Sequence, residues 1–271
     1  MTDNTAHWQA HLALEFAQRY GKTVLSHSSH HGPLMVQRPF YPEGDTCHVY
    51  ILHPPSGIVA GDALTITAQA HGDSSALITT PAAAKFYRSE GRIAKQQVQL
   101  SVADNAALEW LPQETIVYEG AKVSSQLQLN LATAARFIGW EILVLGRPAA
   151  NEGFSAGSVT LNWQVRRADK IYYQERLQLD SLAFAARWGM NAHSSCGALL
   201  AYPCDSQQLQ AVQELIGSHP ARGVTLLDEL LICRALDDRA DVLSGFFEHV
   251  WQILRVDIMQ KPACAPRIWA T

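Results

Sequence analysis

Short segments with the composition of β-strands recur along most of the chain, separated by clusters of Gly, Pro, Asp and Asn. In the clearest of them, residues 126–131, leucines alternate with Gln and Asn, so that one face is apolar and the other carries amides. This period of two residues is typical of a half-buried strand, and helical periods do not interrupt it before Pro203. The chain up to residue 200 therefore predicts a large, mainly β assembly.

The expected strands begin with a hairpin, in which residues 11–16 and 22–25 pair across a turn at Tyr20 and Gly21. Further strands are expected at residues 48–53, 64–68, 76–80, 96–102, 107–111, 126–131, 137–145, 158–166 and 171–179. No strict sequence repeat of the kind found in a regular β-helix or a propeller accompanies these segments. Their spacing alone leaves a sandwich, a barrel and an irregular β-helix open.

The pattern changes after Pro203, where apolar residues take the three- and four-residue spacing of an amphipathic helix. Asp205 or Ser206 is expected to cap this helix, and Gly217 is expected to end it. Its apolar face comprises Leu209, Val212, Leu215 and Ile216. A short β pair is expected to follow, at residues 224–227 and 230–235.

A second helix is expected after Asp237 or Asp238, either of which would cap it. Its apolar positions are Val242, Leu243, Phe246, Val250 and Leu254. Because Phe247 and Trp251 add apolar area on another side, part of this helix is expected to remain exposed for a protein partner. The tail at residues 261–271 contains two prolines and is expected to be extended.

Composition limits the classes of function that need consideration. With 271 residues, 48% of them hydrophobic and 17% charged, the chain predicts a soluble globular protein. A formal net charge of -4 gives no electrostatic reason to expect nucleic acid or an anionic membrane as a partner. Residues 1–11 lack the apolar core of a signal peptide, and no run of about 18 apolar residues follows. We therefore expect a cytoplasmic protein.

The cysteines and histidines do not form a recognisable metal motif. The five cysteines include no CxxC pair, which favours reduced, structural thiols. His27, His30 and His31 crowd what is expected to be a serine-rich loop, and such imidazoles can bind Ni, Zn or Cu, although most loops of this kind are only solvated. His193 and Cys196, with Cys204 beyond them, fit no standard ligand spacing. No role is assigned to either group.

Two short motifs resemble those of enzymes. Residues 153–157 match G-x-S-x-G, but a nucleophile elbow needs a strand before Ser155 and a helix after it, and the segment that follows is β-like. Gly21, Lys22 and Thr23 resemble the end of a Walker A loop, yet Phe16 stands where the first glycine is required. The chain is therefore not expected to bind nucleotide, and a serine hydrolase is retained only as an alternative.

Residues 54–62 are predicted to form a tight turn that positions one acidic side chain. Gly57 and Gly61 permit unusual backbone angles, and Asp62 follows at once, at the start of the strand expected at 64–68. In the simplest interpretation, Asp62 only accepts hydrogen bonds from nearby backbone. The alternative is a functional carboxylate held on a rigid element.

Glu141 and Glu175 interrupt strands that are otherwise largely apolar. A carboxylate in such a position must find a partner, remain protonated or face a water-filled space. One possibility is a salt bridge to an arginine or lysine, for which the candidates are Arg147, Arg176 and Lys85. The other is a polar lining inside a β-rich body.

Several motifs, in order along the chain, resemble those of the urease accessory protein UreD family, also called UreH. They are the segments at 36–42 (VQRPFYP), 57–62 (GIVAGD), 85–88 (KFYR), 111–113 (LPQ), 145–148 (LGRP) and 266–269 (PRIW). The resemblance implies a mainly β fold, a large irregular β-helix-like stack of strands with two C-terminal α-helices. It implies a single domain over residues 1–271, with a β-rich part at 8–200 and a helix-containing part at 203–271.

The resemblance also implies a function that is not enzymatic. A protein of this family is expected to act as a scaffold and nickel-insertion chaperone that bridges urease apoprotein to the accessory protein UreF and, through UreF, to the GTPase UreG. No cofactor is expected to be tightly bound, and nickel would be in transit. The alternative of a different class is a β-rich protein-binding adaptor without a metal role.

Four residues match the positions of a polar nickel passage that the resemblance implies. They are the carboxylates Asp62, Glu141 and Glu175, expected to contact nickel transiently, and Arg147, expected to belong to the passage or to be a structural partner. Ala60, Ala63 and Ala84 depart from the residues expected around Asp62.

Overall fold

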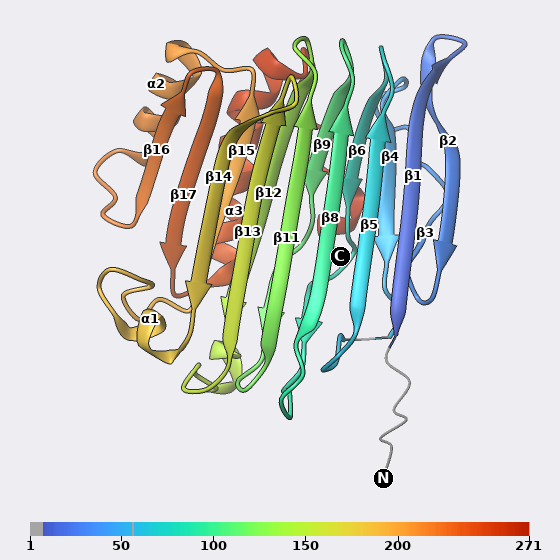
Figure 1. Ribbon diagram of the computed structural model, residues 1–271. Coiled ribbons are helices and arrows are strands. Elements are labelled where there is room, and N and C mark those ends of the chain that lie inside the picture. The colour runs from blue at the N-terminus through green and yellow to red at the C-terminus, as the bar shows by residue number, and fades with distance from the viewer. Residues whose placement is uncertain (1–7, 56, 271) are drawn as a thin grey trace.

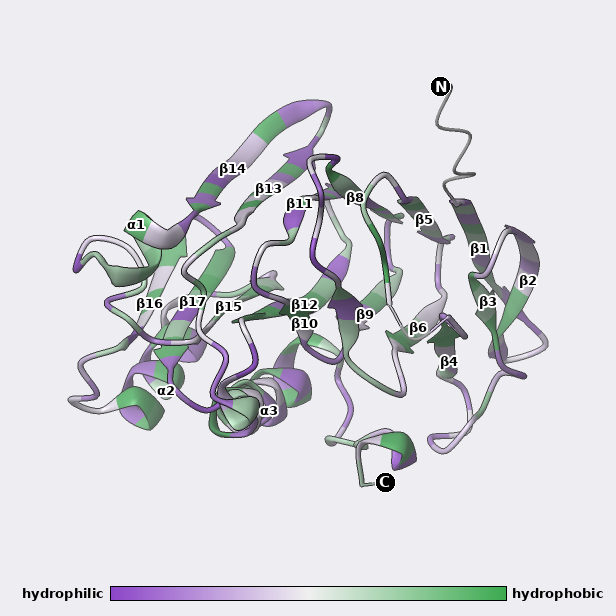
Figure 2. Cartoon of the chain, turned by 90° about the horizontal axis from the view of Figure 1, so that it is seen from below, coloured by the Kyte–Doolittle hydropathy of each residue, from purple (hydrophilic) through white to green (hydrophobic). Residues whose placement is uncertain are grey.

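The computed structural model describes residues 8–55 and 57–270, and it consists of two stacked β-sheets with helices on the outer side of one of them (Figures 1 and 2). The expectation about residues 1–7 and the placement of Ser56 in the tight turn lie outside the described residues. None of the described helices is long and apolar enough to cross a membrane.

One sheet has seven strands in the order β14-β13-β11-β8-β5-β1-β2. Their bounds are β1 Gln9–Arg19, β2 Lys22–His31, β5 Ala63–Ala70, β8 Ala94–Val102, β11 Lys122–Leu131, β13 Ser158–Arg167 and β14 Lys170–Leu179. The five strands from β1 to β13 pair in parallel, and β2 and β14 close the two edges with antiparallel pairing. The expected N-terminal hairpin is the β1–β2 pair.

The other sheet has ten strands, with the main order β16-β17-β15-β12-β9-β6-β4-β3 and with β10 and β7 paired beside β12. Their bounds are β3 Met35–Val36, β4 Cys47–Leu52, β6 Ser75–Thr79, β7 Ala84–Phe86, β9 Ala107–Leu111, β10 Thr115–Val117, β12 Arg136–Leu145, β15 Ser195–Tyr202, β16 Arg222–Leu227 and β17 Leu230–Asp237. Strands β4, β6, β9 and β12 are parallel, whereas β15, β17 and β16 follow with antiparallel pairing.

Successive turns of the chain add one strand to each sheet, so the central part is a β-solenoid-like stack. Ile66 pairs with Val98, Val98 with Leu127, and Leu127 with Trp163, which places four buried apolar side chains in one row. Such a row requires only that each turn bring an apolar residue to the same inward position. This explains why the stack forms without a strict sequence repeat, and it confirms the β-helix-like expectation.

The predicted helices are present, with one correction to their ends. Helix α2 (Ser206–Ile216) is capped by Asp205 in a capping box with Gln208, and it ends at Gly217, as expected. Helix α3 (Ala240–Ile258) begins after Arg239, whose side chain makes no cap hydrogen bond. The expectation that Asp237 or Asp238 caps this helix is wrong, because the Asp237 carboxylate accepts instead from the Arg239 backbone N–H, one position before the helix.

Three further short elements depart from the expectation. A third, short helix, α1 (Ser181–Ala185), follows β14 and is capped by Asp180, whose carboxylate accepts from the Ala183 N–H at 2.9 Å. In the tail at residues 261–271, which was expected to be extended, residues 261–266 are irregular and a 3-10 turn, η2 (Arg267–Ala270), follows them. A second 3-10 turn, η1 (Pro148–Ala150), follows β12. Trp269 of η2 packs its ring against Trp140 and Trp251, which provides the apolar contact that holds the tail.

Apolar cores lie on both sides of the ten-stranded sheet. One fills the space between the two sheets, and the other lies between the ten-stranded sheet and helices α2 and α3, below it in Figure 2. Phe246, Phe247, Val250 and Trp251 are all buried in the second core. The expectation that these residues leave an exposed surface is therefore wrong, because the sheet and the C-terminal tail cover the helix on more than one side.

Candidate functional site

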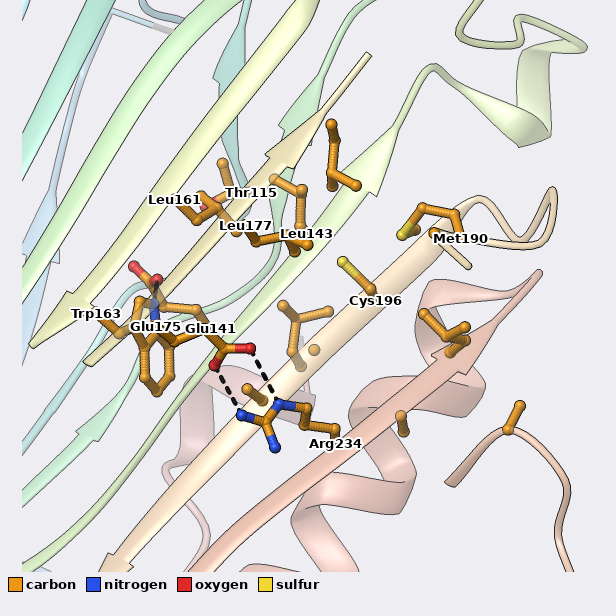
Figure 3. A pocket seen from close by; sticks show the side chains of 18 of the residues that line it. Thr115, Glu141, Leu143, Leu161, Trp163, Glu175, Leu177, Met190, Cys196 and Arg234 are labelled. Carbon is orange, nitrogen blue, oxygen red and sulfur yellow. Dashed lines mark hydrogen bonds and ion pairs between the residues drawn. The ribbon is translucent and has the colours of Figure 1, made fainter. Parts of the chain in front are cut away.

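A cavity of about 410 Å³ lies between the two sheets, at the end of the stack where the pairing becomes antiparallel (Figure 3). Most of its lining is apolar, with side chains from β11, β13 and β14 on one side and from β12, β15 and β17 on the other. Glu141, Glu175 and Arg234 are among the few charged residues that line it. Two of the carboxylates singled out in the sequence thus meet in one space.

Strand register explains how the charged groups come together. On the seven-stranded sheet Trp163 pairs with Glu175, and on the ten-stranded sheet Glu141, Ala198 and Arg234 form one row across β12, β15 and β17. Two sets of hydrogen bonds join these rows across the gap, from Trp163 to Glu141 and from Arg234 to Glu175. The small Ala198 side chain lies between Glu141 and Arg234 in this row and leaves room for the cavity.

Glu141 is a carboxylate in an apolar environment with one hydrogen-bond donor. It shares its face of β12 with Leu143 and Leu145 of the inter-sheet core, and its Oε2 accepts from the Trp163 indole N–H. Burial raises the pKa of the Glu141 carboxyl to about 7, although the Trp163 hydrogen bond acts in the opposite direction. The group therefore exchanges a proton near neutral pH.

Glu175 is paired with an arginine that was not among the expected partners. Arg234 donates from Nε to Oε1 at 3.2 Å and from Nη2 to Oε2 at 3.0 Å, and the Tyr173 hydroxyl donates to Oε2 at 2.5 Å. Tyr173 also accepts from Arg234 Nη2 at 2.5 Å. The two sequence interpretations are thus both partly right, because Glu175 is ion-paired and also lines the cavity.

Arg234 itself carries a sequence signal that was overlooked. It interrupts the apolar strand β17 in the same way that Glu141 and Glu175 interrupt theirs, and it lies in the same row as Glu141 and opposite Glu175. A search for charges of both signs within apolar strands would have found it. With its side chain 45% exposed, Arg234 reaches both the carboxylate and solvent.

Asp62 lies apart from this cavity and does not belong to its lining. It is only 4% exposed, and its two carboxylate oxygens accept from the backbone N–H groups of Trp8 at 2.9 Å and Val59 at 3.0 Å. These bonds tie the start of β1 to the turn before β5. Asp62 thus has the backbone contacts of the simplest interpretation, and its role in nickel transfer stays a prediction.

The two glycines of this turn are required for different reasons. Gly61 has a φ of 91°, in the region that side chains other than glycine rarely adopt. A Cβ at Gly57 would overlap the ring of Tyr87. The loop-shaping role expected of both residues follows from these contacts.

Asp62→Ala is expected to lower the free energy of unfolding by about 1–3 kcal/mol, because two backbone N–H groups lose their acceptor in a buried place. Urea denaturation followed by tryptophan fluorescence measures this difference. Asp45→Ala, which removes an exposed partner of Lys261, is the control and should cost less than about 1 kcal/mol. Equal stability of the Asp62 variant and the parent protein would contradict a structural role for this carboxylate.

Arg147 does not reach Glu141 or Glu175. Its Nε and Nη2 donate to Oε2 of Glu152 at 3.0 and 2.5 Å. Its guanidinium carbon lies 4.6 Å from the centre of the Tyr118 ring. The hydrogen bond to Glu152 raises the pKa of this exposed arginine. Of the two roles expected for Arg147, the geometry supports that of a structural partner in the turn after β12.

The histidine and cysteine groups do not assemble into ligand sets. His27, His30 and His31 lie on the exposed edge strand β2 rather than in the expected loop. His193 bonds to Asp238 at 2.8 Å. Cys196 lines the cavity. The pKa of its thiol is raised to about 12, mainly because the thiol is buried and in smaller part because the carboxylates of Glu175 and Glu141 are close. Among residues 8–55 and 57–270, no group of three His, Cys, Asp or Glu side chains is arranged to hold a metal ion.

Ser155 lies in the irregular segment between η1 and β13, without the strand-to-helix turn of a nucleophile elbow. Its hydroxyl donates to the carboxylate of Glu119, and its backbone N–H donates to the same oxygen at 3.2 Å. A carboxylate in this arrangement orders a surface loop. This geometry does not support the hydrolase alternative.

A buried ion-pair network beside α3 was not anticipated. Arg255, fully buried, donates to Glu109 from Nε at 2.9 Å and to Glu43 from Nη2 at 2.7 Å, and Trp251 also donates to Glu109 at 2.6 Å. Burial alone would raise the pKa of Glu43, but the bonds from His48 and Arg255 outweigh it and lower this pKa to about 2. The network fixes the last helix on the ten-stranded sheet, away from the cavity.

Comparison with known proteins identifies the family. A sequence model described as UreD urease accessory protein matches residues 9–270. The chain belongs to the UreD family. Urease accessory protein UreD of Citrobacter koseri is 45% identical over 98% of this chain and 93% of the relative. The proteins of the same name from Pseudomonas putida and Klebsiella pneumoniae are 43% and 42% identical, over 98% and 97% of this chain and 95% and 96% of the relatives. Membership in the UreD family supports a role in urease maturation.

Proposed function

We propose that this protein is a scaffold and nickel-insertion chaperone for urease, and that nickel passes through the cavity between the two sheets. The observation that carries the proposal is the meeting of Glu141 and Glu175, from opposite sheets, in one space of about 410 Å³. In this proposal the two carboxylates contact the ion in turn or together. Asp62 remains a proposed contact at another point of the route.

The chemistry of the lining suits transfer rather than storage. Ni²⁺ binds carboxylate, water and imidazole ligands, and it exchanges among them more readily than it leaves thiolates. Glu141 and Glu175 supply two carboxylates, and the raised pKa of Cys196 keeps its soft sulfur in the protonated form at neutral pH. An ion that meets two carboxylates and water is held weakly enough to move on.

The proposed partners are urease apoprotein, a UreF-like accessory protein and, through it, a UreG-like GTPase. GTP hydrolysis would belong to the partner, because Phe16 replaces the first glycine that a Walker A loop requires in this chain. The protein itself would act in the cytoplasm without a reaction of its own. An adaptor without a metal role is the competing proposal, and the experiment below separates the two.

Glu141→Gln and Glu175→Gln are expected to assemble with the urease complex yet to deliver several-fold less nickel to urease. Both variants keep the size of the side chain, and the Arg234 charge left by Glu175→Gln is half-exposed and remains solvated. Pull-down with the accessory proteins measures assembly, and elemental analysis of purified urease measures nickel per active site. Glu229→Gln, on the exposed ion pair with Arg167, is the matched control. Normal nickel content in both cavity variants would favour the adaptor.

A further inference from the structure

An ion pair between Arg234 and Glu175 joins the two sheets across the cavity. Arg234 engages both oxygens of Glu175, at 3.2 and 3.0 Å, and the Tyr173 hydroxyl takes a further site on Oε2 at 2.5 Å. In Figure 3 the guanidinium of Arg234 faces the carboxylate of Glu175 from the opposite sheet. A divalent cation that approaches Glu175 therefore meets a carboxylate whose two oxygens already have a positively charged partner.

We propose that Arg234 is a displaceable counter-ion of this cavity, which a divalent cation must replace on Glu175 and which returns to expel it. This inference rests on the proposed function. Arg234 is a positioning residue in it, since it acts on nickel through Glu175 and does not itself bind the ion.

The charge balance in the cavity supports this exchange. Before the cation arrives, the positive charge of Arg234 neutralises Glu175. Once the cation binds the carboxylate, the guanidinium and the ion are like charges a few ångströms apart, and they repel each other. Arg234 can leave because its side chain is 45% exposed and reaches water. The same repulsion lowers the affinity for the ion and speeds its release.

Tyr173 is hydrogen-bonded to both members of the ion pair. Its hydroxyl donates to Glu175 and accepts from Arg234 Nη2 at 2.5 Å, so it closes a triangle of hydrogen bonds. Burial, and then the neighbouring Glu175, raises the pKa of Tyr173, which keeps this hydroxyl protonated. Its removal should loosen the pair without changing the charge of the cavity.

Arg234→Gln is expected to bind Ni²⁺ at least about tenfold more tightly than the parent protein and to release it correspondingly more slowly, because the competing positive charge is gone. Calorimetric titration of the full-length protein with Ni²⁺ alone measures affinity, and competition with a chelator in stopped flow measures release. Urease matured with this variant should gain nickel more slowly. Arg239→Gln, which opens an exposed ion pair with Asp241 outside the cavity, is the matched control.

Tyr173→Phe provides a second test that keeps the charge and the aromatic packing. It is expected to raise the Ni²⁺ affinity several-fold. If Arg234→Gln does not fold, this variant alone tests whether Arg234 competes with the cation for Glu175. Affinity and release rate within twofold of the parent protein in the folded variants would overturn the role of Arg234. If Glu141→Gln and Glu175→Gln still reduce delivery in that case, the proposed passage stands without the counter-ion. If they also leave delivery unchanged, the proposed function itself fails.

Discussion

Arg255→Ala is expected to destabilise the protein by about 3–5 kcal/mol, since it leaves charged carboxylates buried without their cation. Arg255 bonds both Glu109 and Glu43, and all three side chains are at most 8% exposed. The remaining donors, His48 to Glu43 and Trp251 to Glu109, cannot replace the charge of the guanidinium. Urea denaturation measures the loss, and a melting temperature lowered by many degrees should accompany it.

Two comparisons separate the buried charge from the loss of a side chain. Arg239→Ala, just before the start of the same helix, opens an exposed pair with Asp241 and should leave the stability nearly unchanged, because solvent screens this pair. Adding Glu109→Gln to Arg255→Ala should restore part of the lost stability, because one unpaired charge is removed. A loss below about 1 kcal/mol for Arg255→Ala would show that the network contributes little to the fold.

Glu141→Gln is expected to stabilise the protein by about 3 kcal/mol at pH 8 and by much less at pH 4.5, because each pKa unit corresponds to about 1.4 kcal/mol. Burial raises the pKa of Glu141 from 4.5 to about 7 in the folded state. The folded protein therefore favours the protonated group, and stability is lost as the pH rises from 4.5 through 7. Glutamine has no proton to lose, and its amide oxygen still accepts from Trp163.

Melting temperatures of the variant and the parent protein between pH 4.5 and pH 8 measure this effect. The difference should grow with pH and level off above pH 7, where Glu141 is ionised in both states of the parent protein. Glu229→Gln, on the surface, is the control and should show no such trend. A difference that does not change with pH would mean that Glu141 is not held in an apolar environment.

The sequence predicted the strands well because each carries its own alternation of apolar and polar residues. Residues 107–111 were predicted with their observed bounds, and all twelve of the other expected strands overlap strands of the described residues. The short strands β3, β7 and β10 are too brief for a period to show. Strand β15 was missed because it is buried on both faces and lacks the alternation.

The carboxylates of the cavity were found because a charge in an apolar strand is unexpected, but their partners were not. Glu175 and Arg234 are 59 positions apart, and they meet only because β14 and β17 lie in facing sheets. No local pattern encodes which of several arginines faces a given carboxylate. The same limitation hid the contact of Glu43 and Glu109 with α3.

The buried network at α3 joins residues that are far apart in the sequence and are therefore synthesised at different times. Glu43 and Arg255 are 212 residues apart, so the positive charge that pairs with Glu43 is synthesised long after Glu43 itself. The stacked strands can pair turn by turn while the protein is being synthesised. Until α3 packs on the ten-stranded sheet, however, the outer face of that sheet is exposed to water, and Glu43 and Glu109 lack their bonds to Arg255. A nascent chain that does not yet contain α3 thus differs in charge and in exposed apolar surface from a chain that contains it.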